Sequence, residues 1–390
     1  MIHLSIPNFE GNEKKYVNEA LDQGWVSTGG AFIKKFEENL SNYLNVKDVC
    51  CCQSGTSALH LSLIEAGVTR DDIVIVPTLT FIAAVNPVRY VGAEPIFIDC
   101  DDSLCIDPNK LKSFCEKECT YDGKILTNKK NNKIIKAIMV VHVFGNIADM
   151  EQIMDLAAKY NLKVIEDATE AIGTKYIDGR YKDKFAGTIG DFGAFSFNGN
   201  KIITTGGGGA ICAHDEKITG HMRFLSTQAK TDPHNYIHDE VGYNYRMTNI
   251  QAAIGVAQLE FLPEFIERKH KFYEIYEKEF SGFGYGYLIK FREGTFSNMW
   301  FFSLVLDVEK LAQDIFKIIE GLRGLGVETR PIWGLIHEQK PYRNYDAYLM
   351  EKSLFYSKRV INIPSSTNNK YEDIKSAAQI IKKYILGIVC

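Results

Sequence analysis

The sequence predicts an α/β fold in which a mostly parallel sheet is flanked by helices, with a smaller α+β domain after it. One observation is that short β-branched runs alternate with helix-length segments from residue 54 onward, which is typical of βαβ units. Another is the apolar run Val164–Ile165, which ends in Glu166 and Asp167, as a buried parallel strand does at the edge where ligands bind. A third observation is that small hydroxyl residues and a glycine open an apolar helix within residues 52–59. Such a helix start can bind phosphate.

The first part of the chain is predicted to contain amphipathic helices and then alternating strands and helices. Asn12 caps a helix over 12–23, and a second helix carries Phe32, Phe36, Leu40 and Tyr43. After residue 54 we expect strands at 73–76, 95–98, 135–141 and 162–165 and helices at 83–90 and 150–160. Residues 115–135 are rich in lysine and asparagine and lack an apolar period, which indicates a solvated hairpin or a loop insertion.

The domain change is placed near Pro263. Thr248 and Gln251 form a capping box that starts a helix, and Pro263 is expected to stop that helix after residue 262. A further helix, roughly 264–280, would follow. Residues 1–262 would then form the large domain with an N-terminal helical segment, and residues 263–390 the small C-terminal domain. In that small domain we expect apolar strand character at 299–306 and helices at 308–325 and 371–386.

Composition narrows the class of protein. The chain has 390 residues, 45% of them hydrophobic, which is enough for a large core and for two domains. The net charge of −4, with mixed signs, argues against nucleic acid or a membrane surface as the main partner. Neither a signal peptide nor a transmembrane run is recognisable, so a cytoplasmic protein is expected.

Cysteine usage points the same way. The nine cysteines are odd in number, and three are consecutive at Cys50–Cys52 on a strand that looks buried. Such a set fits reduced, core-filling thiols better than a disulfide framework. Cys115 and Cys119 lie four apart on an expected helix, but no second cysteine–histidine pair has metal spacing, so no metal site is expected.

The segment 190–213 carries the strongest chemical signal. Lys201 lies between an apolar strand, 192–197, and a run of four glycines, 206–209. A lysine held in a dry pocket has a lowered pKa and becomes a nucleophile, although this segment alone fits a hairpin with a surface lysine equally well. Together with the carboxylate of Asp167 and the helix start near residue 55, it supplies what pyridoxal phosphate needs: an amine for a Schiff base, a partner for the ring nitrogen and a phosphate site.

These segments resemble a known family. SFNGNK (196–201) and TTGGGGA (204–210), with EDATEAIG (166–173) and SGTSALHLSL (54–63) before them, closely resemble the DegT/DnrJ/EryC1/StrS sugar aminotransferases. The resemblance extends over nearly the whole chain. It implies a fold-type I, pyridoxal-phosphate-dependent transferase that acts on nucleotide-linked keto sugars, with pyridoxamine phosphate formed in the half-reaction.

The resemblance also implies roles for individual residues around the cofactor. Lys201 would form the Schiff base and carry the proton, while Asp167 would keep the pyridine nitrogen protonated. Phe81 would stack on the ring, and the phosphate would be held by Gly55, Thr56 and Ser196. Glu170 departs from the family, whose members often carry glutamine near the phenolic oxygen of the cofactor. A glutamate there would be repelled by a phenolate unless one of the two is protonated.

Other implied roles concern the substrate and a second chain. Asn244 resembles the asparagine that reaches the phosphate of the neighbouring subunit, which implies a homodimer with shared active sites. Ser27, in the loop 25–30, would lie near the substrate. Arg330 could bind a carboxylate or a diphosphate, and His337 could face the sugar, although both could be ordinary surface residues.

The main hypothesis is an enzyme that moves the amino group of L-glutamate to the C4 ketone of a nucleotide-linked 4-keto-6-deoxy sugar. The sequences of its motifs and its lysine-rich insertion look most like those of the subgroup that makes 4-amino-N-acetylhexosamine precursors of legionaminic acid or bacillosamine. The nucleotide carrier would be UDP or GDP. One alternative is a sugar dehydratase of the same fold, in which histidine replaces the lysine that this chain keeps as Lys201. Another is a non-catalytic regulatory protein, which predicts loss of Lys201 or Asp167.

Overall fold

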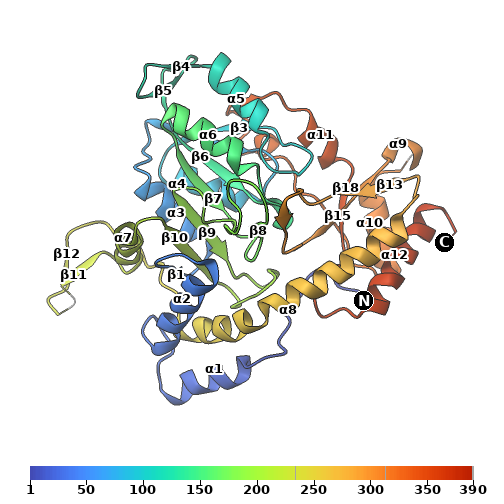
Figure 1. Cartoon of the computed structure of the whole chain (residues 1–390), viewed down its shortest axis with the longest axis horizontal. Coiled ribbons are helices and arrows are strands. Elements are labelled where there is room, and N and C mark those ends of the chain that lie inside the picture. Colours follow the sequence, from blue (N-terminus) through green and yellow to red (C-terminus); the bar gives the residue numbers. More distant parts are fainter. Residues whose placement is uncertain (233, 312, 389–390) are drawn as a thin grey trace.

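The computed structural model describes residues 1–388 except 233 and 312. It confirms the α/β prediction, with one large sheet that is mostly parallel and a smaller antiparallel sheet (Figure 1). In the large sheet the strands lie in the order β1 (Cys50–Cys52), β10 (Gly209–Ala213), β9 (Phe192–Ser196), β7 (Lys163–Asp167), β6 (Ile134–Val141), β2 (Asp72–Pro77), β3 (Glu94–Ile98) and β17 (Ala347–Tyr348). Pairing is parallel from β9 to β17 and antiparallel between β1, β10 and β9.

Both faces of this sheet are covered. Along β2, Ile73 and Ile75 belong to one hydrophobic cluster and Val74 and Val76 to another, as expected for a parallel strand buried on both sides. The covering helices include α2 (Ala31–Leu44), α3 (Gly55–Glu65), α4 (Asn86–Tyr90), α5 (Pro108–Lys117), α6 (Met150–Tyr160) and α7 (Glu216–Ser226), while α1 (Glu13–Asp22) lies along α8 (Asn249–Phe280). Helix η1 (Ile82–Ala84) precedes α4.

The lysine-rich insertion forms a hairpin, as predicted. Strands β4 (Cys119–Tyr121) and β5 (Leu126–Asn128) pair with each other, and β5 also pairs antiparallel with β6 of the large sheet. Cys119 therefore lies on a strand, whereas Cys115 lies in α5; the expectation of a shared helix was wrong, because α5 ends at Lys117. Eight cysteines of the described chain are free and buried.

The helix that was expected to stop at Pro263 does not stop there. Helix α8 runs unbroken from Asn249 to Phe280, starting at the predicted capping box of Thr248. A proline inside a helix removes one backbone hydrogen bond. Here the neighbouring Leu262 and Phe265 are fully buried, and α8 packs along α1, α2 and the C-terminal helix α12 (Tyr371–Ile385). Tertiary packing thus holds the helix together through the proline.

The smaller sheet lies at the far end of α8 (Figure 1). Its antiparallel strands are β13 (Gly286–Leu288), β15 (Phe302–Leu306), β18 (Val360–Ile363) and β16 (Arg330–Pro331). Its hydrophobic cluster also includes α8, α12 and α10 (Ile315–Gly324). Further short elements are α9 (Val308–Leu311), α11 (Lys352–Ser357), the pair β8 (Lys175–Tyr176) and β14 (Thr295–Phe296), and the projecting hairpin β11 (Lys230–Asp232) and β12 (Ile237–His238).

Chain segments cross between the two sheets in several places. Ile2 bridges to Val327, beside the small sheet, and β17 returns to pair with β3 in the large one. The boundary after residue 262 falls inside α8 and remains a prediction. Among the described residues, no helix combines the length and apolar composition that crossing a membrane requires.

Candidate active site

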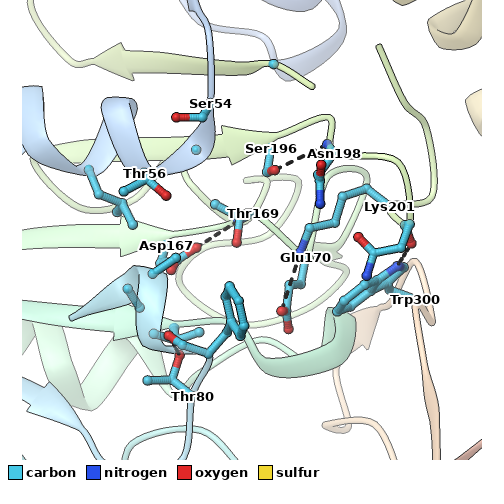
Figure 2. Close-up of a pocket in the computed structure, with 18 of the residues that line it drawn as sticks. Ser54, Thr56, Thr80, Asp167, Thr169, Glu170, Ser196, Asn198, Lys201 and Trp300 are labelled. Atoms are coloured by element: carbon cyan, nitrogen blue, oxygen red, sulfur yellow. Dashed lines mark hydrogen bonds and ion pairs between the residues drawn. The ribbon is translucent and has the colours of Figure 1, made fainter. Parts of the chain in front are cut away.

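A cavity of about 460 Å³ opens at the carboxyl edge of the parallel strands (Figure 2). Ligands of α/β sheets bind at this edge. Most of the residues singled out from the sequence line it, although they are far apart in the chain: Gly55, Thr56, Phe81, Asp167, Glu170, Ser196 and Lys201. The fold therefore brings together the amine, the acids and the helix start that the motifs pointed to.

The start of α3 is shaped to receive an anion. Ser54 caps the helix by accepting a hydrogen bond from the N–H of Ser57 at 3.1 Å. The N–H groups of Gly55 and Thr56 precede the first intrahelical bond, so they are available to a ligand at the positive end of the helix dipole. A Cβ on Gly55 would meet Thr169 Cγ2 at 2.7 Å, so only glycine fits where the helix start approaches the end of β7.

Asp167 ends β7 and is buried, with 4% of its surface exposed. Its Oδ1 accepts a hydrogen bond from the N–H of Thr169 at 3.0 Å. Burial raises the pKa of the Asp167 carboxyl, while the hydrogen bonds from Thr169 and the charge of Lys201 act in the opposite direction. A cation placed in the cavity would stabilise the ionised form of this side chain.

The neighbouring acid has a different environment. Because side chains alternate along a strand, Glu166 points to the opposite face of the sheet from Asp167. Its Oε2 accepts from His142 Nε2 at 2.8 Å and from the N–H of Gly187 at 2.9 Å, and Oε1 accepts from the N–H of Ile189 at 2.6 Å. The motif ED thus contains one carboxylate saturated by the protein and one that lines the cavity.

Lys201 follows the turn after β9, where its N–H donates to the carbonyl of Asn198 at 3.0 Å. Its Nζ lies 3.5 Å from Glu170 Oε1 and 4.0 Å from the centre of the Trp300 ring. The side chain is 12% exposed, and Figure 2 shows it reaching between Glu170 and Trp300. This amine is confined but makes only long contacts, so it can move toward a ligand.

Glu170 lies under this amine. Its Oε2 accepts from the N–H of Phe144 at 2.9 Å. Burial raises the pKa of the Glu170 carboxyl to about 7, against the opposing effect of Lys201. Near neutral pH this side chain is therefore protonated in a large fraction of molecules.

Aromatic residues from the C-terminal part of the chain complete the cavity: Trp300, Phe301 and Trp333. Trp300 stacks on Phe301 with 3.9 Å between ring centres, and Trp333 packs against Phe144 at 4.5 Å. Sequence reasoning missed them, because a lone aromatic residue is far more often part of a core than of a binding site.

The remaining predicted residues lie outside the cavity of a single chain. Asn244 is exposed and its backbone bridges to Thr227. Nδ1 of His337 lies 2.6 Å from Thr78 Oγ1, at the end of β2. Arg330 is 56% exposed beside Glu328, and the carbonyl of Ser27 accepts from the N–H of Asn249 at 2.7 Å. Their roles toward a substrate or a second chain stay predictions.

Comparisons with known proteins agree with this geometry. The sequence model of the DegT/DnrJ/EryC1/StrS aminotransferase family matches residues 7–382. The chain is 38% identical over 379 residues to GDP-perosamine synthase of Escherichia coli O157:H7, with 97% of each chain covered. It is 30% identical to UDP-4-amino-4,6-dideoxy-N-acetyl-beta-L-altrosamine transaminase of Campylobacter jejuni, over 96% of this chain and 95% of that one.

A solved structure shows the same fold. The structure titled as the PLP-form of the putative sugar aminotransferase Spr1654 from Streptococcus pneumoniae superposes with a TM-score of 0.85 at 22% identity and covers 100% of both chains.

Proposed function

Because the chain belongs to the DegT/DnrJ/EryC1/StrS aminotransferase family, we propose that it transfers the amino group of L-glutamate to the C4 ketone of a nucleotide-linked 4-keto-6-deoxy sugar. Members of this family are pyridoxal-phosphate-dependent sugar aminotransferases, and this chain is such an enzyme. The observation that carries the proposal is the meeting of Lys201, Asp167 and the start of α3 in one cavity.

The cavity fits pyridoxal phosphate. Among the described residues no lysine or arginine lies within ion-pair distance of Asp167, although the carboxyl is buried and its pKa is raised. A protonated ring nitrogen would supply the missing positive charge. The N–H groups at the start of α3 and the hydroxyl of Ser196 suit a phosphate. When bound, the cofactor supplies an electron-deficient ring that stabilises negative charge on the carbon from which a proton is removed.

The residues of this chain would divide the remaining work. Nζ of Lys201 would hold the cofactor covalently and, once displaced by substrate, would carry the proton between the substrate carbon and the C4′ carbon of the cofactor. Asp167 would orient the ring by its nitrogen, and Phe81, which is 53% exposed at the cavity, would cover one face of it. The aromatic wall of Trp300 and Trp333 would limit the access of water.

Glu170 would act as a neutral acid. The sequence raised the difficulty that a carboxylate beside a phenolate is repelled. A pKa of about 7 supports a different state, in which the carboxyl keeps its proton and donates a hydrogen bond. A glutamine at this position would donate from its amide instead, so the two side chains would serve the same purpose near neutral pH.

The similar proteins narrow the choice of nucleotide-sugar substrate. Identity to the GDP-perosamine synthase is 38%, against 30% to the UDP-sugar transaminase. This favours a GDP-linked keto sugar over the N-acetylhexosamine substrates expected from the motifs, which become the second candidate. Since these relatives are named as a synthase and a transaminase, a dehydratase is not favoured.

The active site would be completed in a homodimer. Asn244 is exposed and lies outside its own cavity, as a residue that serves the site of a partner chain would.

The substrate proposal is tested by incubating the holoenzyme with L-glutamate and a panel of GDP-, UDP- and dTDP-linked 4-keto-6-deoxy sugars, with products identified by NMR. We expect a C4 amine and the highest kcat/KM with a GDP-linked sugar. Amination at another carbon, or no amination of any nucleotide sugar, would contradict the proposal.

A further inference from the structure

A fully buried lysine lies outside the cavity, on α8. Lys269 is 1% exposed, and its Nζ donates to the carbonyl of Trp300 at 2.9 Å and to the carbonyl of Ser365 at 2.6 Å. In the part of the chain that the structure describes, no carboxylate lies within ion-pair distance of Lys269 Nζ. Burial lowers the pKa of its amine to about 7. Burying an amine in this way is costly, and an apolar residue of similar length would often serve stability as well.

Three segments far apart in the sequence meet at this amine. The N–H of Ser365 donates to the carbonyl of Leu4 at 3.0 Å. The hydroxyl of Ser365 lies 3.0 Å from the carbonyl of Trp300 and 3.1 Å from that of Leu4, so it can donate to either. Lys269 and Ser365 therefore join α8, the N-terminal segment and the Trp300 segment at one point, which we term the Lys269 junction.

Two of these segments continue to Lys201. The indole N–H of Trp300 donates to the carbonyl of Asn200 at 2.8 Å, and the hydroxyl of Ser5 donates to the same carbonyl at 2.7 Å. Asn200 directly precedes Lys201, and the Trp300 ring lies 4.0 Å from Lys201 Nζ. Figure 2 shows the indole beside the lysine chain. Both donors that hold the backbone before Lys201 thus come from segments joined at the Lys269 junction.

We propose that Lys269 is a positioning residue for Lys201, which acts by holding the carbonyls of Trp300 and Ser365 so that the indole holds the backbone before Lys201 and packs beside its side chain. This inference rests on the proposed function only in taking Lys201 as the amine that binds the cofactor. A small displacement of such an amine is enough to slow a reaction, because rates depend steeply on the geometry of the reacting groups.

A purely structural role for Lys269 predicts something different. In that case Lys269→Met would lower the melting temperature and leave the folded molecules fully reactive. Under our proposal the melting temperature is kept and the reactivity falls, because methionine fills the same space without a buried charge. The carbonyl of Trp300 loses its hydrogen bond from Lys269, and Lys201 loses its alignment.

The test measures how fast Lys201 captures the cofactor. Apoprotein is mixed with pyridoxal phosphate, quenched with borohydride at intervals, and the label on Lys201 is counted by peptide mass spectrometry. For Lys269→Met we expect a melting temperature within a few degrees of wild type, capture about tenfold slower, and kcat about tenfold lower with little change in KM. Lys271→Met, on the exposed side of the same helix, is the matched control and should behave as wild type.

The double variant shows whether Lys269 acts through Trp300. Trp300→Phe keeps an aromatic face but removes the indole N–H, so it should slow capture by itself. If the proposal is right, adding Lys269→Met slows capture little further, since contacts acting in series are not additive. Multiplied effects in the double variant, or wild-type capture in Lys269→Met, would overturn it.

Two controls separate the possible failures. Should Lys269→Met not fold, Ser365→Ala removes a hydroxyl from the same junction and should slow capture in the same direction by a smaller factor; wild-type capture there would overturn the proposal. If wild-type protein carries the label on a lysine other than Lys201, the proposed function itself fails. If the label is on Lys201 but the variants capture it normally, only the positioning role fails.

Discussion

Two lysines with little exposure to solvent, Lys201 and Lys269, have opposite surroundings. Nζ of Lys201 lies 3.5 Å from Glu170 and above the Trp300 ring, on the wall of a cavity. Nζ of Lys269 is held at 2.6 and 2.9 Å by the carbonyls of Ser365 and Trp300, away from that cavity. The first amine has space and weak partners, whereas the second has short hydrogen bonds to fixed backbone groups.

Burial alone does not favour Lys201 as the nucleophile, because Lys269 is the more buried of the two. A nucleophilic amine must also reach its target without breaking strong hydrogen bonds. The same contrast separates the adjacent acids: Glu166 accepts from His142 and several backbone N–H groups, while Asp167 lines the cavity.

The largest effect is expected at the open amine. Lys201→Ala removes both the covalent attachment and the proton carrier, and general acid–base catalysis alone contributes about 10² to 10⁴-fold. We therefore expect turnover to fall by more than about 10⁴-fold, measured as glutamate-dependent amination at saturating substrate. Circular dichroism would confirm that the fold is kept. A variant with a tenth of the wild-type rate would show that another base moves the proton.

Asp167→Asn should rank second. The amide cannot hold a proton on the ring nitrogen by charge, so the negative charge that develops on the substrate carbon is less well stabilised. A loss of about 4 kcal/mol in the transition state corresponds to about a thousandfold in rate. Glu166→Gln, in the saturated acid next to it, should act mainly on thermal stability. Asp167→Asn within threefold of wild type in kcat would mean that another group keeps the ring protonated.

Mixed dimers test whether one site draws on two chains. Lys201→Ala is expected to be inactive, and Asn244→Asp should be severely impaired because its carboxylate would repel the phosphate in the site of a partner chain. If Asn244 of one chain serves Lys201 of the other, as proposed, both defects fall in one shared site of the mixed dimer. The second site is whole, so activity should return to about half that of a wild-type dimer.

Subunit exchange in this experiment is confirmed by native mass spectrometry. Exchange without recovery of activity would place Asn244 within its own subunit or outside the site.

The smallest effect concerns Glu170 in the apoprotein. Its pKa is raised from 4.5 to about 7 in the folded protein by burial, so the folded state holds a proton that the unfolded state has lost between these values. Stability therefore decreases as pH rises from about 4.5 to about 7. Glu170→Gln does not titrate, so wild type should lose melting temperature relative to it over this range. Parallel curves for the two proteins would show that the folded carboxyl ionises normally.

Local sequence patterns predicted the parts of the candidate site that are formed by residues adjacent in the sequence. Asp167 ends β7, Lys201 follows the turn after β9, and Gly55 opens α3, so each lies where its motif alone predicts a turn or an element end. Helix α8 could not be predicted, because its continuity through Pro263 depends on packing against distant helices. Trp300 enters the cavity only through the return of the C-terminal segment.

Lys269 shows this limit most clearly. It stands in the run Arg268–Lys269–His270–Lys271, which reads as a solvated helix surface. Only the three segments that close over it in the folded chain make it a buried amine.

We expect Lys201, and not Lys269, to be the amine that binds the cofactor. Borohydride reduction of the holoenzyme, followed by proteolysis and mass spectrometry, tests it directly. We predict one reduced cofactor per chain, on the peptide that contains Lys201, and unmodified Lys269. A label on Lys269 or on any other lysine, with Lys201 unmodified, would show that Lys201 is not the cofactor-binding amine.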